Sequence, residues 1–178
     1  MNRRTLIISL LSLPVTARLP GSPAIVLSSR RRYTSRSEGA GPVEVEVLLA
    51  PTERLARGWR NREAHDPFDG KIGEFYIADA HPLELPEDLP GTATTYETVV
   101  GAAAQEGIVH VGGFRRELFV WTVRVHGGAA EDVIRAGEAI AAMPLPDPME
   151  VRLGLASLET LLPGPEVFGP EYDADPEG

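Results

Sequence analysis

The stretch IVHVGGFRRELFVWTVRVH, residues 108–126, decides the fold class of this chain. Its two halves, Ile108–Phe114 and Leu118–His126, are rich in β-branched and aromatic residues and flank the polar residues 115–117, a pattern typical of a β-hairpin. Apolar side chains recur at every second position of the second half and share one face: Phe119, Trp121, Val123 and Val125. We therefore expect a hairpin with one face in the core.

A helix is predicted immediately after this hairpin, over residues 129–143. Glu131 and Asp132 fall in its first turn, where the helix dipole favours acidic residues, and Pro144 ends it. One stripe carries its small and apolar residues: Val133, Ile134, Gly137, Ile140 and Ala141. We expect an α+β fold, a curved antiparallel sheet with this C-terminal amphipathic helix packed across one face.

The preceding sequence supplies further short elements. Residues 43–49 (VEVEVLL) alternate apolar and acidic side chains, which predicts a strand with one face in water. Strands are also predicted over 73–78 and 92–100, and a short helix is predicted from Pro51 to Arg57, which Gly58 would end. We interpret Gly112-Gly113 as a bulge or a close backbone approach within the hairpin.

Residues 1–24 have the three-part layout of a secretory signal peptide. Two arginines precede an uncharged run, and small residues follow it, in MNRRTLIISLLSLPVTA. Residues 2–7 (NRRTLI) resemble the twin-arginine export motif, which implies that the domain folds before it crosses the membrane. We expect an extracytoplasmic or secreted protein. The alternatives are a general secretory signal, weak membrane anchoring through the N-terminus, and a mis-assigned start codon.

Charge divides the chain near Arg36. Residues 1–36 contain seven arginines and no acid, whereas the remaining residues contain ten basic and all 26 acidic residues. A domain this acidic repels phosphates, so we expect no nucleic-acid partner. Residues 25–42, which include Arg30-Arg31-Arg32, are rich in Arg, Ser and Gly and are interpreted as a linker.

The sequence excludes several chemistries. It contains no cysteine, which excludes disulfides, thiol nucleophiles, thiolate metal sites and a lipid-modified cysteine. No nucleophile elbow, phosphate-binding loop or HExxH motif is present. We expect no cofactor and no metal, and we assign no catalytic residue.

Residues 43–148 are predicted to form the domain, and residues 149–178 a partial repeat and acidic tail. The repeat rests on residues 43–58 (VEVEVLLAPTERLARG), which align with residues 149–164 (MEVRLGLASLETLLPG) with seven identities in sixteen positions. Three fates are open for so short a copy: packing on the first unit, pairing with another molecule, or disorder.

Two groups of residues are candidates for ligand binding. His65, Asp66 and Asp69 combine imidazole and carboxylates in a loop-like segment. In the hairpin, a three-residue turn would place His110 opposite Thr122, so that His110, Arg124 and His126 share the face away from Trp121, where they could bind an anion or a metal. The alternative interpretation of the first group is a simple turn, and that of the second group is a set of solvent-facing positions on the sheet.

The order of strand, short helix, strands, hairpin and helix over residues 43–144 resembles the PsbP/Mog1-like layout of small exported domains. This resemblance implies binding or assembly roles and carries over no site residue. We therefore expect an exported, non-catalytic domain that binds an unknown protein or small molecule. The rival hypotheses are a secreted hydrolase or metal-dependent enzyme at the two candidate groups, and an intracellular scaffold fragment with a spurious leader.

Overall fold

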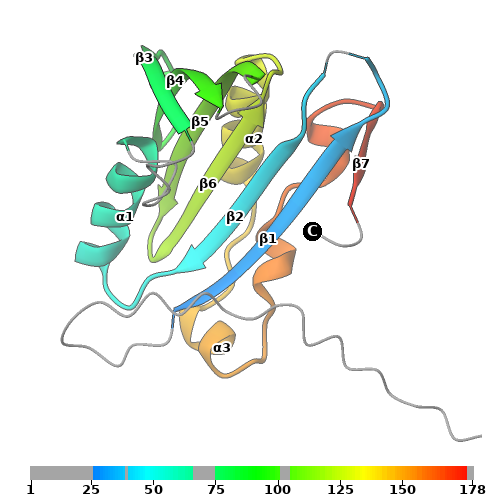
Figure 1. Ribbon diagram of the computed structural model, residues 1–178. Coiled ribbons are helices and arrows are strands. Elements are labelled where there is room, and N and C mark those ends of the chain that lie inside the picture. The colour runs from blue at the N-terminus through cyan, green and yellow to red at the C-terminus, as the bar shows by residue number, and fades with distance from the viewer. Residues whose placement is uncertain (1–25, 39, 66–74, 101–104, 176–178) are drawn as a thin grey trace, which may run out of the picture.

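The computed structural model describes residues 26–38, 40–65, 75–100 and 105–175. Within these residues, seven strands form one antiparallel sheet in the order β3-β4-β5-β6-β2-β1-β7, accompanied by helices, so the fold is of the α+β type (Figure 1). The strands are β1 (Leu27–Ser35), β2 (Val43–Leu49), β3 (Phe75–Leu83), β4 (Gly91–Val100), β5 (Gln105–Arg116), β6 (Phe119–His126) and β7 (Tyr172–Ala174). The helices are α1 (Glu53–His65), α2 (Glu131–Ala142) and α3 (Pro148–Arg152), followed by the short 3-10 helices η1 (Leu158–Leu161) and η2 (Pro165–Val167).

The predicted hairpin forms the centre of the sheet. The four residues assigned to its apolar face, Phe119, Trp121, Val123 and Val125, are all fully buried, which confirms that assignment. On β2, the valines at 43, 45 and 47 pair with these β6 residues and enter the same core cluster. The alternation of apolar and polar residues therefore places the apolar side chains of both strands on the same, buried face of the sheet.

Helix α2 contributes Val133, Ala136 and Ile140 to this core cluster. Its approach to the sheet depends on two glycines, because a Cβ on Gly112 would lie 2.5 Å from Cγ1 of Val133, and one on Gly137 would lie 2.5 Å from Cε1 of Phe114. Of the two interpretations of Gly112-Gly113, the close backbone approach is correct at Gly112.

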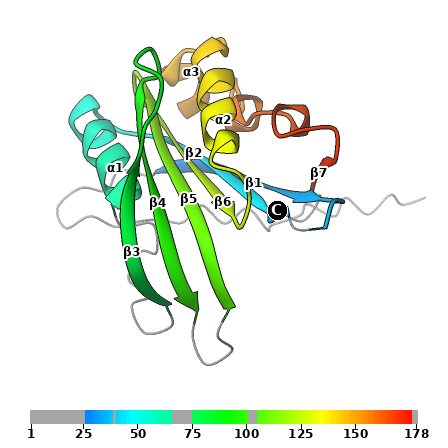
Figure 2. The same cartoon turned by 90° about the horizontal axis from the view of Figure 1, so that it is seen from above.

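Helix α1 packs on the opposite face of the sheet (Figure 2). Its Ala56 joins Val120, whose side chain alternates with those of Phe119 and Trp121, in a separate apolar cluster. The helix continues through Gly58, where it was expected to end. Gly58 does not adopt the positive φ that ends helices.

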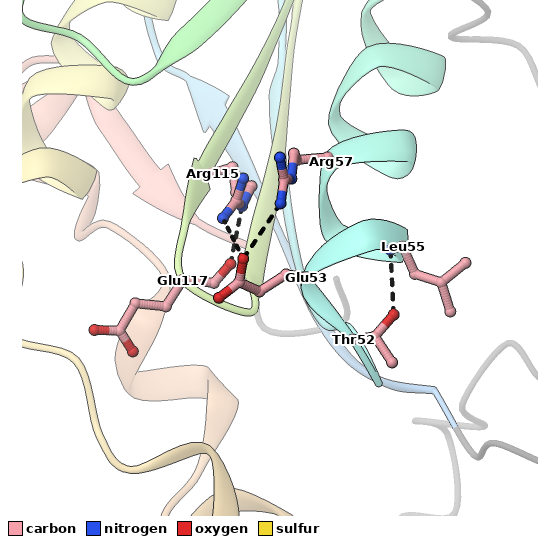
Figure 3. A network of polar contacts seen from close by, with 6 residues as sticks. All are labelled: Thr52, Glu53, Leu55, Arg57, Arg115 and Glu117. Carbon is pink, nitrogen blue, oxygen red and sulfur yellow. Dashed lines mark hydrogen bonds and ion pairs between the residues drawn. The ribbon is translucent and has the colours of Figure 1, made fainter.

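Polar contacts fix the beginning of α1 beside the β5–β6 turn (Figure 3). The Thr52 hydroxyl accepts a hydrogen bond from the Leu55 amide at 3.3 Å, as an N-cap does. The Glu53 carboxylate lies 3.4 Å from Arg57 and 4.0 Å from Arg115, whose Nε donates to the Glu117 carbonyl at 2.9 Å. Glu53 thus connects the helix to the hairpin.

The prediction that residues 25–42 are a linker is wrong for residues 27–35. These residues form β1, which pairs with β2 along seven residue pairs from Leu27 with Leu49 to Tyr33 with Val43. Tyr33 is fully buried, and its hydroxyl donates to the Pro163 carbonyl. Strand β1 resembles a linker in composition, because it contains a single aromatic residue and several arginines. Its structure becomes clear only from the glutamates of β2 that lie opposite Arg30 and Arg32.

The interpretation of residues 149–178 as a partial repeat and acidic tail is also corrected. Residues 43–58 contain β2 and the first part of α1, whereas the aligned residues 149–164 contain α3 and η1, so the two segments differ in structure. Of the three fates left open, packing on the domain is observed: Leu158, Leu161, Leu162, Phe168 and Tyr172 are buried in the main core cluster. In the predicted tail, Tyr172–Ala174 forms β7 and pairs with β1.

The predicted signal peptide, residues 1–24, lies outside the described residues. No helix in the described ranges is both long and apolar enough to cross a membrane.

Candidate functional site

The structure places the predicted hairpin residues on two different faces of the sheet. His110 pairs with Val125, and Val111 pairs with Arg124, so His110 lies on the face of Trp121 while Arg124 and His126 lie on the other. The prediction that His110 faces Thr122 and shares a site with Arg124 and His126 is therefore wrong.

The cause of the error is the turn. It contains two residues, Glu117 and Leu118, because Arg116 already pairs with Phe119. Glu117 adopts a φ of 52°, the conformation that two-residue hairpin turns require at their first central position. A change of register by an odd number of residues moves every side chain of one strand to the other face relative to its partner.

His110 is buried against β4 and the beginning of α2. Its Nδ1 lies 2.8 Å from the Thr95 hydroxyl, and 8 % of the residue is exposed. Burial lowers the pKa of His110, although a backbone hydrogen bond with Gly128 and the carboxylates of Glu131 and Asp132 act in the opposite direction. A neutral imidazole with a hydroxyl partner in the core is part of the packing between the elements.

Asp132 is a buried acid that the sequence indicated only as a favourable first-turn residue. It is 4 % exposed and lies 3.2 Å from Arg135, which donates to the Phe168 carbonyl at 3.0 Å. Burial raises the pKa of Asp132, and the Arg135 guanidinium opposes this rise. The pair joins α2 to the C-terminal segment.

The other face of β1, β2 and β6 carries a group of charged residues, here called the charged strand face. Its members are Arg30, Arg32, Glu44, Glu46, Arg124 and His126. The strand register places Arg32 and Arg124 on either side of Glu44, and Arg30 beside Glu46. Diagonal ion pairs join Arg30 to Glu44 at 3.0 Å and Arg124 to Glu46 at 4.0 Å.

Helix α1 contacts β4, β5 and β6, and it leaves β1 and β2 outside its main contacts. The side chain of Arg30 is 55 % exposed, whereas those of Glu44 and Arg124 are each 16 % exposed. The charged strand face therefore has an exposed margin on β1 and a more buried centre on β2 and β6. Three arginines against two glutamates make it locally basic within a chain of net charge −9.

His126 lies at one end of the charged strand face. Its Nε2 is buried and has no hydrogen-bond partner among the described residues. Burial lowers the pKa of His126, Glu44 opposes this shift, and Arg124, Arg32 and Arg30 reinforce it. Buried polar atoms are almost always paired in folded proteins, so this nitrogen is an exception among the polar groups of the charged strand face.

The second predicted group is described only in part. His65 is the last residue of α1, and Asp66 and Asp69 lie outside the described residues, so a site at His65, Asp66 and Asp69 stays a prediction. Among the residues that are described, no cluster of three or more histidine or acidic side chains is arranged to hold a metal ion.

The sequence pattern alone missed the arginines of β1 and the glutamates of β2 as site residues. The alternation VEVEV is a usable signal, because it places Glu44 and Glu46 on one face, but the composition around their partners Arg30 and Arg32 predicts a linker. No protein-family model matches this chain, and no curated protein matches its sequence.

Proposed function

We propose that this chain is an exported, non-catalytic domain that binds a partner protein or small ligand at the cell exterior through the charged strand face. The observation that carries the proposal is the group of three arginines and two glutamates that the strand register places on one face, with the unpartnered Nε2 of His126 at its end. Export is supported by the signal-like residues 1–24 and the twin-arginine pattern of residues 2–7. Helix α2, packed across the opposite face, serves as a structural layer.

The chemistry of the face favours an acidic ligand. Arg30, Arg32 and Arg124 attract negative charge, because they outnumber the two glutamates of the face. Binding is favoured over proton transfer because both glutamates of the face are held in ion pairs, Glu44 with Arg30 and Glu46 with Arg124. Such groups position a ligand without supplying a free base or nucleophile.

Native mass spectrometry of the protein recovered from the culture exterior tests this function. We expect the wild-type chain to start after the leader and to carry a bound mass, and we expect Arg124→Glu to lose that mass. Arg54→Glu is the matched control, because Arg54 is an exposed arginine of α1 outside the charged strand face. An intact Met1 on cytoplasmic material, or a bound mass that is unaffected by Arg124→Glu, contradicts the proposal.

A further inference from the structure

Strand β1 has an open edge next to the charged strand face. The outer neighbour of β1 is β7, which pairs only with Tyr33, Thr34 and Ser35 (Figure 1). Strand β1 begins at Leu27, so most of its length has no strand partner on this side within the described residues. Unpaired strand edges are templates for the addition of another strand.

The hydrogen bonds around β7 identify the backbone groups that point outward. The Asp175 amide donates to the Arg32 carbonyl at 2.8 Å, and the Arg36 amide donates to the Glu171 carbonyl at 2.9 Å. Because the backbone groups of an antiparallel strand alternate in direction, those of Ser28 and Arg30 point the same way as those of Arg32. Ser28 and Arg30 therefore present outward N–H and C=O groups at the open edge.

The charge of the edge indicates what binds there. On the inner side, Arg30 pairs with Glu44 of β2 at 3.0 Å. On the outer side, Arg36 just beyond β1 pairs with Asp173 of β7 at 3.0 Å. Acidic residues on the adjacent strand therefore satisfy these arginines in both cases. A second copy pairing through β1 would instead bring arginines together, which is unfavourable.

We propose that the open edge of β1, from Leu27 to Arg31, binds an extended segment of a partner protein that has acidic residues at every second position. The segment adds a strand to the sheet beyond the end of β7. Its backbone pairs with Ser28 and Arg30, and its acidic side chains lie beside Arg30 and Arg32. This inference rests on the proposed function, because it names the partner of the charged strand face.

The test uses the full chain and a fluorescently labelled nine-residue peptide that alternates glutamate and valine, the pattern of β2. Anisotropy measures binding, and hydrogen exchange measures protection of the Ser28 and Arg30 amides. We expect Arg30→Glu to weaken binding about tenfold or more, because it reverses the charge that meets the peptide. Arg54→Glu, the control on α1, is expected to leave the affinity unchanged.

A second variant, Ser28→Pro, removes an outward N–H without changing the charge of the edge, and edge strands tolerate proline at such positions. It is expected to weaken binding, because the peptide loses one backbone hydrogen bond while Arg30 and Arg32 remain in place. Urea unfolding of each variant establishes that it is folded. A peptide with lysine in place of glutamate is expected not to bind.

Several results overturn the inference. If the peptide has the same affinity for the wild type and for Arg30→Glu, it does not bind at the edge of β1. If the Ser28 and Arg30 amides are protected from hydrogen exchange without peptide, another segment of this chain covers the edge. If the wild type forms a dimer and Arg30→Glu does not, a second copy of the chain binds there. A bound mass that is lost in Arg124→Glu, together with no peptide binding, leaves the proposed function standing and overturns only this inference.

Discussion

Gly137 and Gly112 set the distance between helix α2 and the sheet. A Cβ at either position would lie closer than 3.0 Å to the ring of Phe114, which is fully buried. Native cores are packed so closely that even one added methyl group forces neighbouring atoms to shift. The glycines are therefore required by packing, although glycine is a poor residue for the interior of a helix or strand.

We predict that Gly137→Ala lowers the free energy of unfolding by about 1–3 kcal/mol, the usual cost of overpacking a core. Gly58→Ala in α1 is the matched control, since a Cβ there has nothing within 4 Å. It is expected to raise stability by about 0.5–1 kcal/mol through better helix propensity. Urea unfolding measures both, and the same sign for the two variants contradicts the packing argument.

The two histidines of the hairpin predict how stability depends on pH. Burial lowers the pKa of both His110 and His126 in the folded state below the usual 6.5. Between the lowered folded-state pKa and 6.5, the unfolded chain binds protons that the folded chain does not. The contribution of the two histidines to the free energy of unfolding is therefore fully present above about pH 6.5 and decreases as the pH falls through this window.

Urea unfolding at a series of pH values from 5 to 8 checks this expectation. The variant His126→Gln is expected to have a shallower pH dependence than the wild type, because one of the two titrating groups is gone. The pKa of Asp132 is raised, so its protonation at lower pH increases stability and opposes the effect of the histidines. The histidine variants are therefore compared in a chain that also carries Asp132→Asn, which removes this group. A stability that is constant across this range rules out the assigned protonation states.

At the scale of elements, the β5–β6 turn shows how a small local difference changes a functional interpretation. Residues 115–117 contain no glycine, asparagine or aspartate, the residues that usually signal a two-residue turn. Glu117 nevertheless adopts positive φ, and Arg115 donates to its carbonyl. The strands and the apolar face of β6 were predictable, but the register that separates His110 from His126 was not.

The C-terminal elements are held to the sheet by buried hydrogen bonds as well as apolar contacts. The Tyr33 hydroxyl donates to the Pro163 carbonyl, and Nε1 of Trp121 donates to the Leu161 carbonyl at 2.7 Å. The ring of Phe168 lies against Tyr33, with ring centroids 4.8 Å apart. Burial raises the pKa of the Tyr33 hydroxyl to about 12, so it remains a donor at all physiological pH values.

We predict that Tyr33→Phe lowers the free energy of unfolding by about 1–3 kcal/mol, because it leaves the Pro163 carbonyl buried without its donor. Hydrogen exchange should become faster in residues 158–174. Tyr172→Phe is the control, because the Tyr172 hydroxyl makes a longer contact of 3.4 Å with the Gly41 carbonyl. An equal loss in the two variants argues against a special role for the Tyr33 bond.

At the scale of the whole molecule, the division of charge along the chain does not coincide with the boundary of the fold. Arg30 and Arg32 belong to the basic N-terminal part of the sequence, yet they lie on β1 beside the glutamates of β2. The domain thus begins before the change of sign near Arg36. Opposite charges that are separated in sequence are brought together by strand pairing.

The twin-arginine pattern of residues 2–7 makes a prediction about the whole chain. Replacing both arginines, Arg3→Lys and Arg4→Lys, preserves the positive charge that a general secretory signal needs but removes the twin-arginine motif. We expect the doubly substituted chain to accumulate in the cytoplasm, where cell fractionation detects it. Continued export of this variant indicates the general secretory route instead.

The amino-acid sequence by itself determined the elements with a clear hydrophobic period: β2, β6, the hairpin as a unit and the position of α2. Local side-chain alternation and helical periodicity depend only on nearby residues, so they can be recognised in one sequence. Only the tertiary structure decided that residues 27–35 are a strand, that residues 149–175 pack on the domain and that His110 and His126 lie on opposite faces. These features depend on contacts between distant residues, such as Arg30 with Glu44 and Tyr33 with Pro163, for which a local pattern contains no signal.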